Sequence, residues 1–204
     1  MKFRYYALKI VLFCVVVFIL QSFILSFTDL FVLNKLSWQE PWRFVSSIFL
    51  HGSFGHLLYN MFALALFGSL LEKFVGSKNF LLVFLISGIV ANLASVNFYD
   101  SSLGASGAIY GIFGVLMIIR PKMIVWAAGF PMPMLIAGFV WAGGDLIGLF
   151  VPSNVGHIAH LSGMIIGFLF SIFMKDQYKE KNLEENRIVL DEKEMQRWED
   201  IHLK

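Results

Sequence analysis

Long apolar runs, separated by short polar segments, occupy most of this chain. No charged residue occurs between Arg43 and Glu72, or between Lys78 and Asp100. Roughly 20 helical residues of this kind cross a hydrocarbon layer of about 30 Å. The pattern therefore predicts an all-α, polytopic membrane protein in which six transmembrane helices form a bundle. The spans are expected at about residues 7–27, 55–71, 80–96, 106–119, 133–150 and 157–174.

The six spans are expected to form one membrane domain, residues 1–174, followed by a charged cytoplasmic tail, residues 175–204. Acidic and basic residues alternate in short blocks along the tail, which is typical of a solvated and partly helical segment. A weak apolar stripe of Met195, Trp198 and Ile201 leaves room for a docking helix. The loop between the first two spans is rich in aromatic residues, so we expect it to lie partly in the membrane interface.

The fourth predicted span is unusually short. Its 14 residues, 106–119, would measure about 21 Å as a helix, which is too short for a full crossing. If Arg120 and Lys122 anchor its lower end, Ser106 at its upper end lies below the opposite membrane surface. The pattern thus predicts a serine inside the membrane.

Charge decides the expected orientation. With six spans, all of the 16 Lys and Arg residues except Lys35 and Arg43 fall on the side of the two termini. The positive-inside rule then predicts a multi-pass protein of the cell (plasma) membrane with both termini in the cytoplasm. Ser106 and His160 would both begin their helices at the external side. The net charge of +2 is too small to suggest nucleic acid as a partner, and the single cysteine, Cys14, excludes an intrachain disulfide.

Ser106 and His160 are the candidate nucleophile and general base. A serine needs an adjacent base to take its proton. Both residues stand beside glycines spaced for close helix packing, at Gly104, Gly107, Gly111 and Gly114 for the serine and at Gly163 and Gly167 for the histidine. His157 lacks this relation to the glycines and serves as the comparison residue. Neither Asp100 nor Asp145 is tied to His160 by spacing, so the sequence predicts a dyad rather than a triad.

Three further residues could complete such a site. His56 and Asn60 are four apart and share one helix face, so with the backbone N–H of Ser106 they could bind an oxyanion. A hydrogen bond between packed spans is the alternative role for these two side chains. Tyr110 follows Ser106 by one turn and could hold the imidazole of His160, or could simply pack.

Four motifs together resemble the rhomboid family of intramembrane serine proteases. They are Gly104-Ala105-Ser106-Gly107 with Tyr110 and Gly111, the stretch AHLSGMIIG at 159–167, His51 with His56 and Asn60, and Trp42-Arg43 in the first loop. The resemblance covers about residues 40–170. It implies a basic six-span form in which Ser106 is the nucleophile, His160 the base, and His56, Asn60 and the Ser106 amide the oxyanion hole.

The resemblance also implies a substrate and a route of entry. The partners would be the lipid bilayer and single-pass transmembrane proteins, cut near the external side after entering past the fifth span. We expect no cofactor, no metal and no nucleic acid. A metalloprotease is disfavoured because no H-E-x-x-H occurs, and because His157 and His160 lack a carboxylate partner in the sequence. The alternative is a non-proteolytic rhomboid-like module that binds or chaperones membrane proteins, although such relatives lack the serine or the histidine.

Overall fold

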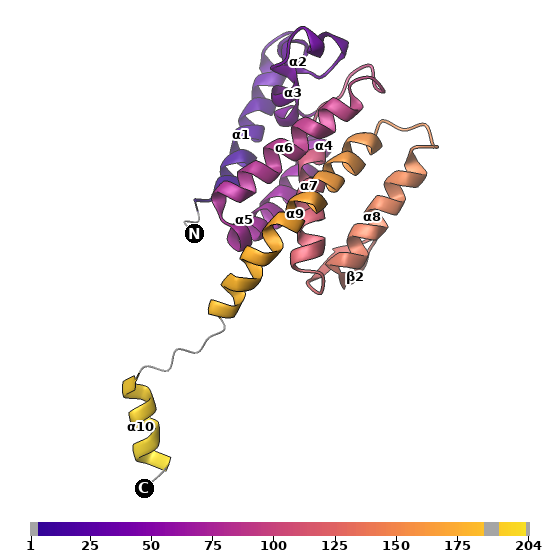
Figure 1. Ribbon diagram of the computed structural model, residues 1–204. Coiled ribbons are helices and arrows are strands. Elements are labelled where there is room, and N and C mark those ends of the chain that lie inside the picture. Colours follow the sequence, from indigo (N-terminus) through magenta and orange to yellow (C-terminus); the bar gives the residue numbers. More distant parts are fainter. Residues whose placement is uncertain (1–3, 186–191, 203–204) are drawn as a thin grey trace.

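The computed structural model describes residues 4–185 and 192–202 (Figure 1). Six apolar helical segments form a bundle, and two of them, α7 and α8, are shorter than a full membrane crossing. The segments are α1 (Tyr6–Phe23), Phe54–Val75, α6 (Ser77–Ser95), α7 (Ser106–Ile119), α8 (Met134–Gly148) and the apolar part of α9 (His157–Glu185). The predicted fold class, an all-α polytopic bundle, is confirmed.

The outer surface of the bundle is apolar, as a lipid environment requires. Large side chains such as Leu12 and Phe13 on α1, Phe139 on α8 and Phe173 on α9 are exposed. A soluble protein rarely leaves a contiguous apolar surface of this extent uncovered. Together with the four helices long enough to cross a bilayer, this surface shows a multi-pass membrane protein.

The short helix α7 lies at the centre of the bundle, between α6, α8 and α9 (Figure 1). Eleven of its 14 residues are buried, whereas only three of the 18 residues of α1 are buried. A helix that is apolar on all sides is expected to be enclosed by others. Because Ser106 is the first residue of α7, the fold puts this serine at one end of the central helix.

The second span is not a uniform α-helix. Its 22 residues comprise α4 (Phe54–Ala63), a π-helical turn η3 (Leu64–Gly68) and α5 (Ser69–Val75). It runs a few residues beyond the predicted end at 71, and Gly76, with a φ of +82°, turns the chain directly into α6. A positive φ is readily adopted by glycine because it has no Cβ.

Other boundaries differ from the sequence prediction by a few residues, and one element was not predicted. α1 ends at Phe23 instead of about 27, and α2 (Phe27–Phe31) follows as a separate turn. Strands β1 (Ile124–Ala127) and β2 (Phe130–Pro133) form an antiparallel hairpin before α8. Its two-residue turn, Ala128-Gly129, has positive φ at both positions, the geometry of the tight hairpin turns that twist with their strands.

A buried carboxylate closes the start of α1. Glu72, on α5, accepts hydrogen bonds from the backbone N–H groups of Tyr6 and Ala7, both at 3.0 Å, and from the Ser77 hydroxyl at 2.6 Å. The first N–H groups of a helix have no partner within the helix, and a negative charge there is favourable. Glu72 therefore joins three helices at the end of the bundle opposite Ser106.

The charged tail is only partly described. α9 continues past the membrane segment to Glu185, and α10 (Glu192–His202) carries the exposed Met195, Trp198 and Ile201. The parts of the predicted tail at 186–191 and 203–204 lie outside the described residues. A docking role for the apolar stripe of α10 stays a prediction.

Candidate active site

Ser106 begins α7 at the wall of a cavity of about 970 Å³. The same cavity is lined by His160, His56 and Asn60. All four side chains that the sequence proposed for the nucleophile, the base and the oxyanion donors therefore face one space. Because the backbone N–H of Ser106 belongs to the first turn of a helix, it has no partner within that helix.

The turn before Ser106 requires a glycine. Gly104 has a φ of +122°, and a Cβ at this position would lie 2.7 Å from the imidazole of His56. The Gly104 amide also donates to the carbonyl of Ser47 at 2.9 Å, which ties this turn to the first loop. Gly104 thus lets the segment that carries Ser106 approach α4 closely.

Glycines bring α7 and α9 into backbone contact, as the sequence predicted. A Cβ at Gly163 would collide with the carbonyl of Gly107, and one at Gly167 with the carbonyl of Gly111. Small residues at such an interface let two membrane helices approach until their backbones touch. The consequence for the site is that the start of α7 and the start of α9 are fixed against each other.

His160 is buried and held on two sides. Its Nδ1 lies 3.0 Å from Oδ1 of Asp145, and the ring of Tyr110 stacks on its imidazole with centroids 4.2 Å apart and planes at 10°. The contact between Tyr110 and the imidazole is the one that helical spacing suggested. With Nδ1 engaged by Asp145, Nε2 is the nitrogen that remains for another partner.

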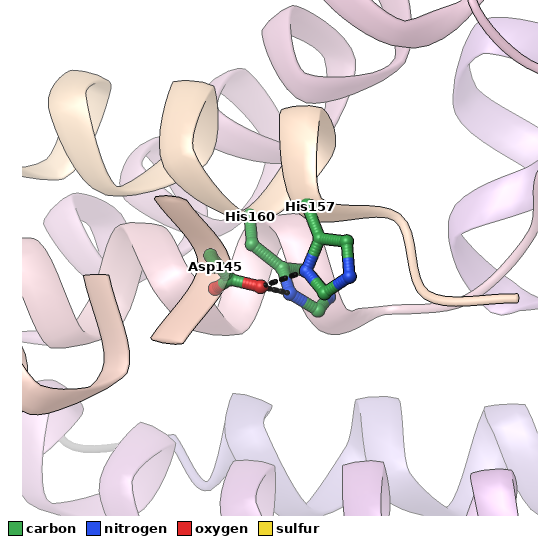
Figure 2. Close-up of side chains that lie close together, drawn as sticks. All are labelled: Asp145, His157 and His160. Carbon is green, nitrogen blue, oxygen red and sulfur yellow. Dashed lines mark hydrogen bonds and ion pairs between the residues drawn. The ribbon is translucent and has the colours of Figure 1, made fainter. Parts of the chain in front are cut away.

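The sequence predicted that no acid orients His160, and the structure shows that this is wrong. Asp145, on α8, is 5% exposed. It contacts His160, which lies 15 positions later in the chain (Figure 2). Spacing could not reveal the contact, because the loop between α8 and α9 sets it. A different signal was available: Asp145 is the only acidic residue within the six predicted spans. An ionisable residue inside a membrane span is expected to have a functional partner.

His157 shares the same carboxylate oxygen. Its Nδ1 lies 2.6 Å from Oδ1 of Asp145, and its Nε2 lies 2.9 Å from the Ser153 hydroxyl. Figure 2 shows both imidazoles converging on Asp145 from successive turns of α9. The expectation that His157 and His160 lack a carboxylate partner is therefore also wrong. The structure makes His157 a neighbour of the site rather than a distant comparison residue.

His56 and Asn60 lie on one face of α4, and Asn60 donates one amide hydrogen to the carbonyl of His56 at 3.0 Å. The second hydrogen of that amide remains for the cavity. His51 lies behind them, fully buried, with its ring edge-on to His56 at 5.2 Å. Burial lowers the pKa of His51 to about 4, so this histidine is neutral at pH 7. It supports His56 without lining the cavity.

Trp42 and Arg43 lie away from the cavity and organise the first loop. This loop contains α2, η1 (Lys35–Trp38), α3 (Arg43–Ser46) and η2 (Ser47–Phe49). The buried Arg43 guanidinium donates to the carbonyls of Asp29 at 2.6 Å and Val32 at 3.0 Å and pairs with Glu40. Trp42 is half exposed. A further contact ties the loop to the bundle, because the side-chain amide of Asn92 on α6 donates to the carbonyl of Phe44 at 2.8 Å. These contacts hold the loop that supports Gly104.

Comparison with known proteins matches this arrangement to one family. The model of the Rhomboid domain matches residues 38–177. YdcA of Bacillus subtilis (strain 168), whose name places it among the rhomboid proteases, is 35% identical over 147 residues, covering 70% of this chain and 71% of that protein. Rhomboid protease GluP of the same organism is 35% identical over 133 residues, covering 63% of this chain and 25% of GluP.

A third relative is more distant and matches a longer stretch of this chain. Rhomboid protease GlpG of Yersinia pseudotuberculosis serotype I (strain IP32953) is 27% identical over 177 residues, covering 81% of this chain and 61% of GlpG. The region that the Rhomboid domain model matches, residues 38–177, contains every candidate site residue from Trp42 to His160.

Proposed function

The chain belongs to the rhomboid family and is a rhomboid-type serine endopeptidase, and we propose that it cleaves transmembrane helices with Ser106 as nucleophile and His160 as general base. One observation carries the assignment of these two residues. Ser106 and His160 line one cavity, and Asp145 engages Nδ1 of His160, which leaves Nε2 as the proton acceptor. We therefore extend the predicted dyad by a positioning carboxylate.

In the proposed reaction, Nε2 of His160 takes the proton of Ser106 as Oγ bonds to the substrate carbonyl carbon. His160 then gives this proton to the departing amine, the C–N bond breaks, and an acyl-enzyme remains. Water attacks the ester, His160 accepts the water's proton and returns it to Oγ, and the carboxylic acid leaves. Asp145 holds the tautomer with hydrogen on Nδ1 and stabilises the imidazolium that forms.

Negative charge on the carbonyl oxygen must be stabilised in the tetrahedral intermediate. We assign this task to the backbone N–H of Ser106, the free amide hydrogen of Asn60 and the imidazole of His56. Support comes from their common cavity and from the close approach of Gly104 to the His56 ring.

We propose that the substrate helix enters sideways past α8 and unwinds before cleavage, because a helical peptide bond is shielded by its own hydrogen bonds. α8 contacts the bundle through aromatic rings, such as Trp141 with Phe113 at 4.4 Å and with Phe67 at 6.1 Å, and through the hydrogen bonds of Asp145 to α9. Side chains at Gly143 and Gly144 would meet nothing within 4 Å, so this part of the helix faces open space. A disulfide that locks α8 to the second span would abolish cleavage if α8 must move.

We also propose that both termini lie in the cytoplasm and that the Ser106 end of the bundle faces the exterior of the cell. The excess of Lys and Arg on the side of the termini supports this orientation. Water for deacylation would then enter the cavity from outside. The test introduces a cysteine at Ser153 or at Lys204 and treats intact cells with a membrane-impermeant thiol reagent. We expect the reagent to label the cysteine at position 153 and not the one at position 204.

The function is tested by cleavage of a helix-destabilised transmembrane substrate in proteoliposomes. Wild type is compared with Ser106→Ala, His160→Ala and His157→Ala. We expect no cleavage with the first two variants and residual or full cleavage with the third. Cleavage by Ser106→Ala would show that the activity does not depend on this serine and would overturn the proposal.

A further inference from the structure

Three metal-ligating side chains meet where α8 ends and α9 begins. The ligand atoms of Asp145, His157 and His160 all lie within 4.8 Å of one another, and no other such group occurs among the described residues. Oδ1 of Asp145 lies 2.6 Å from Nδ1 of His157 and 3.0 Å from Nδ1 of His160. The proposed proteolysis uses two of these side chains and leaves His157 without a role.

We propose that Asp145, His157 and His160 form an inhibitory site for a divalent transition metal, with Zn²⁺ as the best-fitting ion. Zinc prefers imidazole nitrogen and carboxylate oxygen at about 2.0–2.2 Å in a tetrahedral arrangement. Ligand atoms around such an ion are roughly 3.4 Å apart. The two hydrogen-bonded distances would therefore widen by less than about 1 Å, which side-chain rotation can supply.

The environment suits a bound cation. Asp145 is buried and contributes a negative charge, and its Oδ2 has no hydrogen-bond partner in the described structure. The Ser153 hydroxyl, 2.9 Å from Nε2 of His157, would fix the ring with Nδ1 turned towards the metal. A hydrogen-bonded second nitrogen is the usual device that orients a ligating histidine. Ser153 and His160 both line the cavity, so an ion can reach the site from there.

Inhibition follows from the chemistry of one imidazole. When Nδ1 of His160 binds the metal, the proton of the neutral ring must sit on Nε2. Nε2 is then a donor and cannot accept the proton of Ser106. The metal would also occupy Oδ1 of Asp145. Zinc binding and nucleophile activation are therefore mutually exclusive in this arrangement.

This inference rests on the proposed roles of His160 and Asp145, but metal binding can be measured without catalysis. Purified Ser106→Ala protein without an affinity tag is titrated with Co²⁺ in detergent, and the visible absorption of tetrahedral Co²⁺ is recorded. Zn²⁺ is then added to displace it. We expect one Co²⁺ per chain and loss of the absorption on adding His157→Ala to this background. The matched control, His202→Ala, removes an exposed histidine on α10 and should leave the spectrum unchanged.

The functional arm uses the Ser106-containing enzyme in proteoliposomes. We expect Zn²⁺ to inhibit cleavage, EDTA to restore it, and the half-inhibitory Zn²⁺ concentration to rise at least about tenfold in His157→Ala but not in His202→Ala. If Co²⁺ does not bind, or if His157→Ala leaves Co²⁺ binding unchanged, the proposed metal site is wrong, whatever the cleavage assay shows. Binding as expected in a chain that never cleaves would instead overturn the proposed function and leave the site standing.

Discussion

Nδ1 of His160 lies 3.0 Å from a carboxylate oxygen of Asp145, although the two residues stand on different helices. This pair connects α8, the helix proposed to admit substrate, with α9, the helix that carries the general base. Any movement of α8 large enough to separate them would also remove the group that fixes the imidazole. Substrate entry and activation of Ser106 are thus physically coupled in the proposed mechanism.

The first prediction concerns Asp145. Replacing it with Asn keeps the shape but removes the charge that stabilises the imidazolium, so kcat/KM for a transmembrane substrate should fall by roughly 10²-fold. KM should change little. Asp100→Asn, which removes an exposed carboxylate at the same cavity, is the matched control. Equal effects of the two variants would contradict a positioning role for Asp145.

The second prediction concerns the backbone contact between α7 and α9. Gly167→Ala places a methyl group against the carbonyl of Gly111, so the bundle should lose about 1–3 kcal/mol of unfolding free energy. Gly143→Ala adds the same methyl group to α8 where nothing lies within 4 Å, and should be neutral or slightly stabilising. Denaturant titration of both proteins in the same detergent compares them. A similar loss in both would show that the α7–α9 contact is not the cause.

The third prediction concerns Glu72, which caps α1. Glu72→Gln removes a charged acceptor from the N–H groups of Tyr6 and Ala7, so the unfolding free energy should fall by about 1–3 kcal/mol. Glu199→Gln, on the exposed face of α10, is the control and should have no measurable effect. Thermal unfolding monitored by circular dichroism provides the comparison. An unchanged midpoint for Glu72→Gln would contradict the capping role.

The fourth prediction concerns α8 as the entry helix. Trp141→Ala removes the contacts of the Trp141 ring with Phe67 and Phe113, so α8 should separate from the bundle more readily. We expect a lower unfolding midpoint together with faster cleavage of a transmembrane substrate. Phe139→Ala, which removes a lipid-exposed ring from the same helix, should change neither. If cleavage by Trp141→Ala instead declines along with stability, movement of α8 does not limit substrate entry.

Much of the fold could be predicted from sequence because apolar runs of sufficient length have few alternatives in a bilayer. The bounds of the short helix that begins at Ser106 followed from its apolar run, and the contact of Gly163 and Gly167 with α7 followed from glycine spacing. These signals are local, because each is a pattern of residues within one stretch of the sequence.

The parts that escaped prediction depend on contacts between segments. Asp145 meets His160 only because the chain between α8 and α9 reverses direction, and Glu72 meets α1 across 65 positions of chain. The hairpin of β1 and β2 also escaped prediction, because its two-residue turn, Ala128-Gly129, carries a weak sequence signal. The position of Asp145 inside a predicted span was informative, but it could not identify which histidine would be its partner.

The central claim is that Ser106 is a nucleophile activated by His160. The most direct test treats the wild-type protein in proteoliposomes with a serine-directed fluorophosphonate and locates the adduct by mass spectrometry. We predict a single adduct on Ser106 that disappears in Ser106→Ala and is strongly reduced in His160→Ala. An adduct elsewhere, or labelling of Ser106 that is undiminished in His160→Ala, would contradict the account.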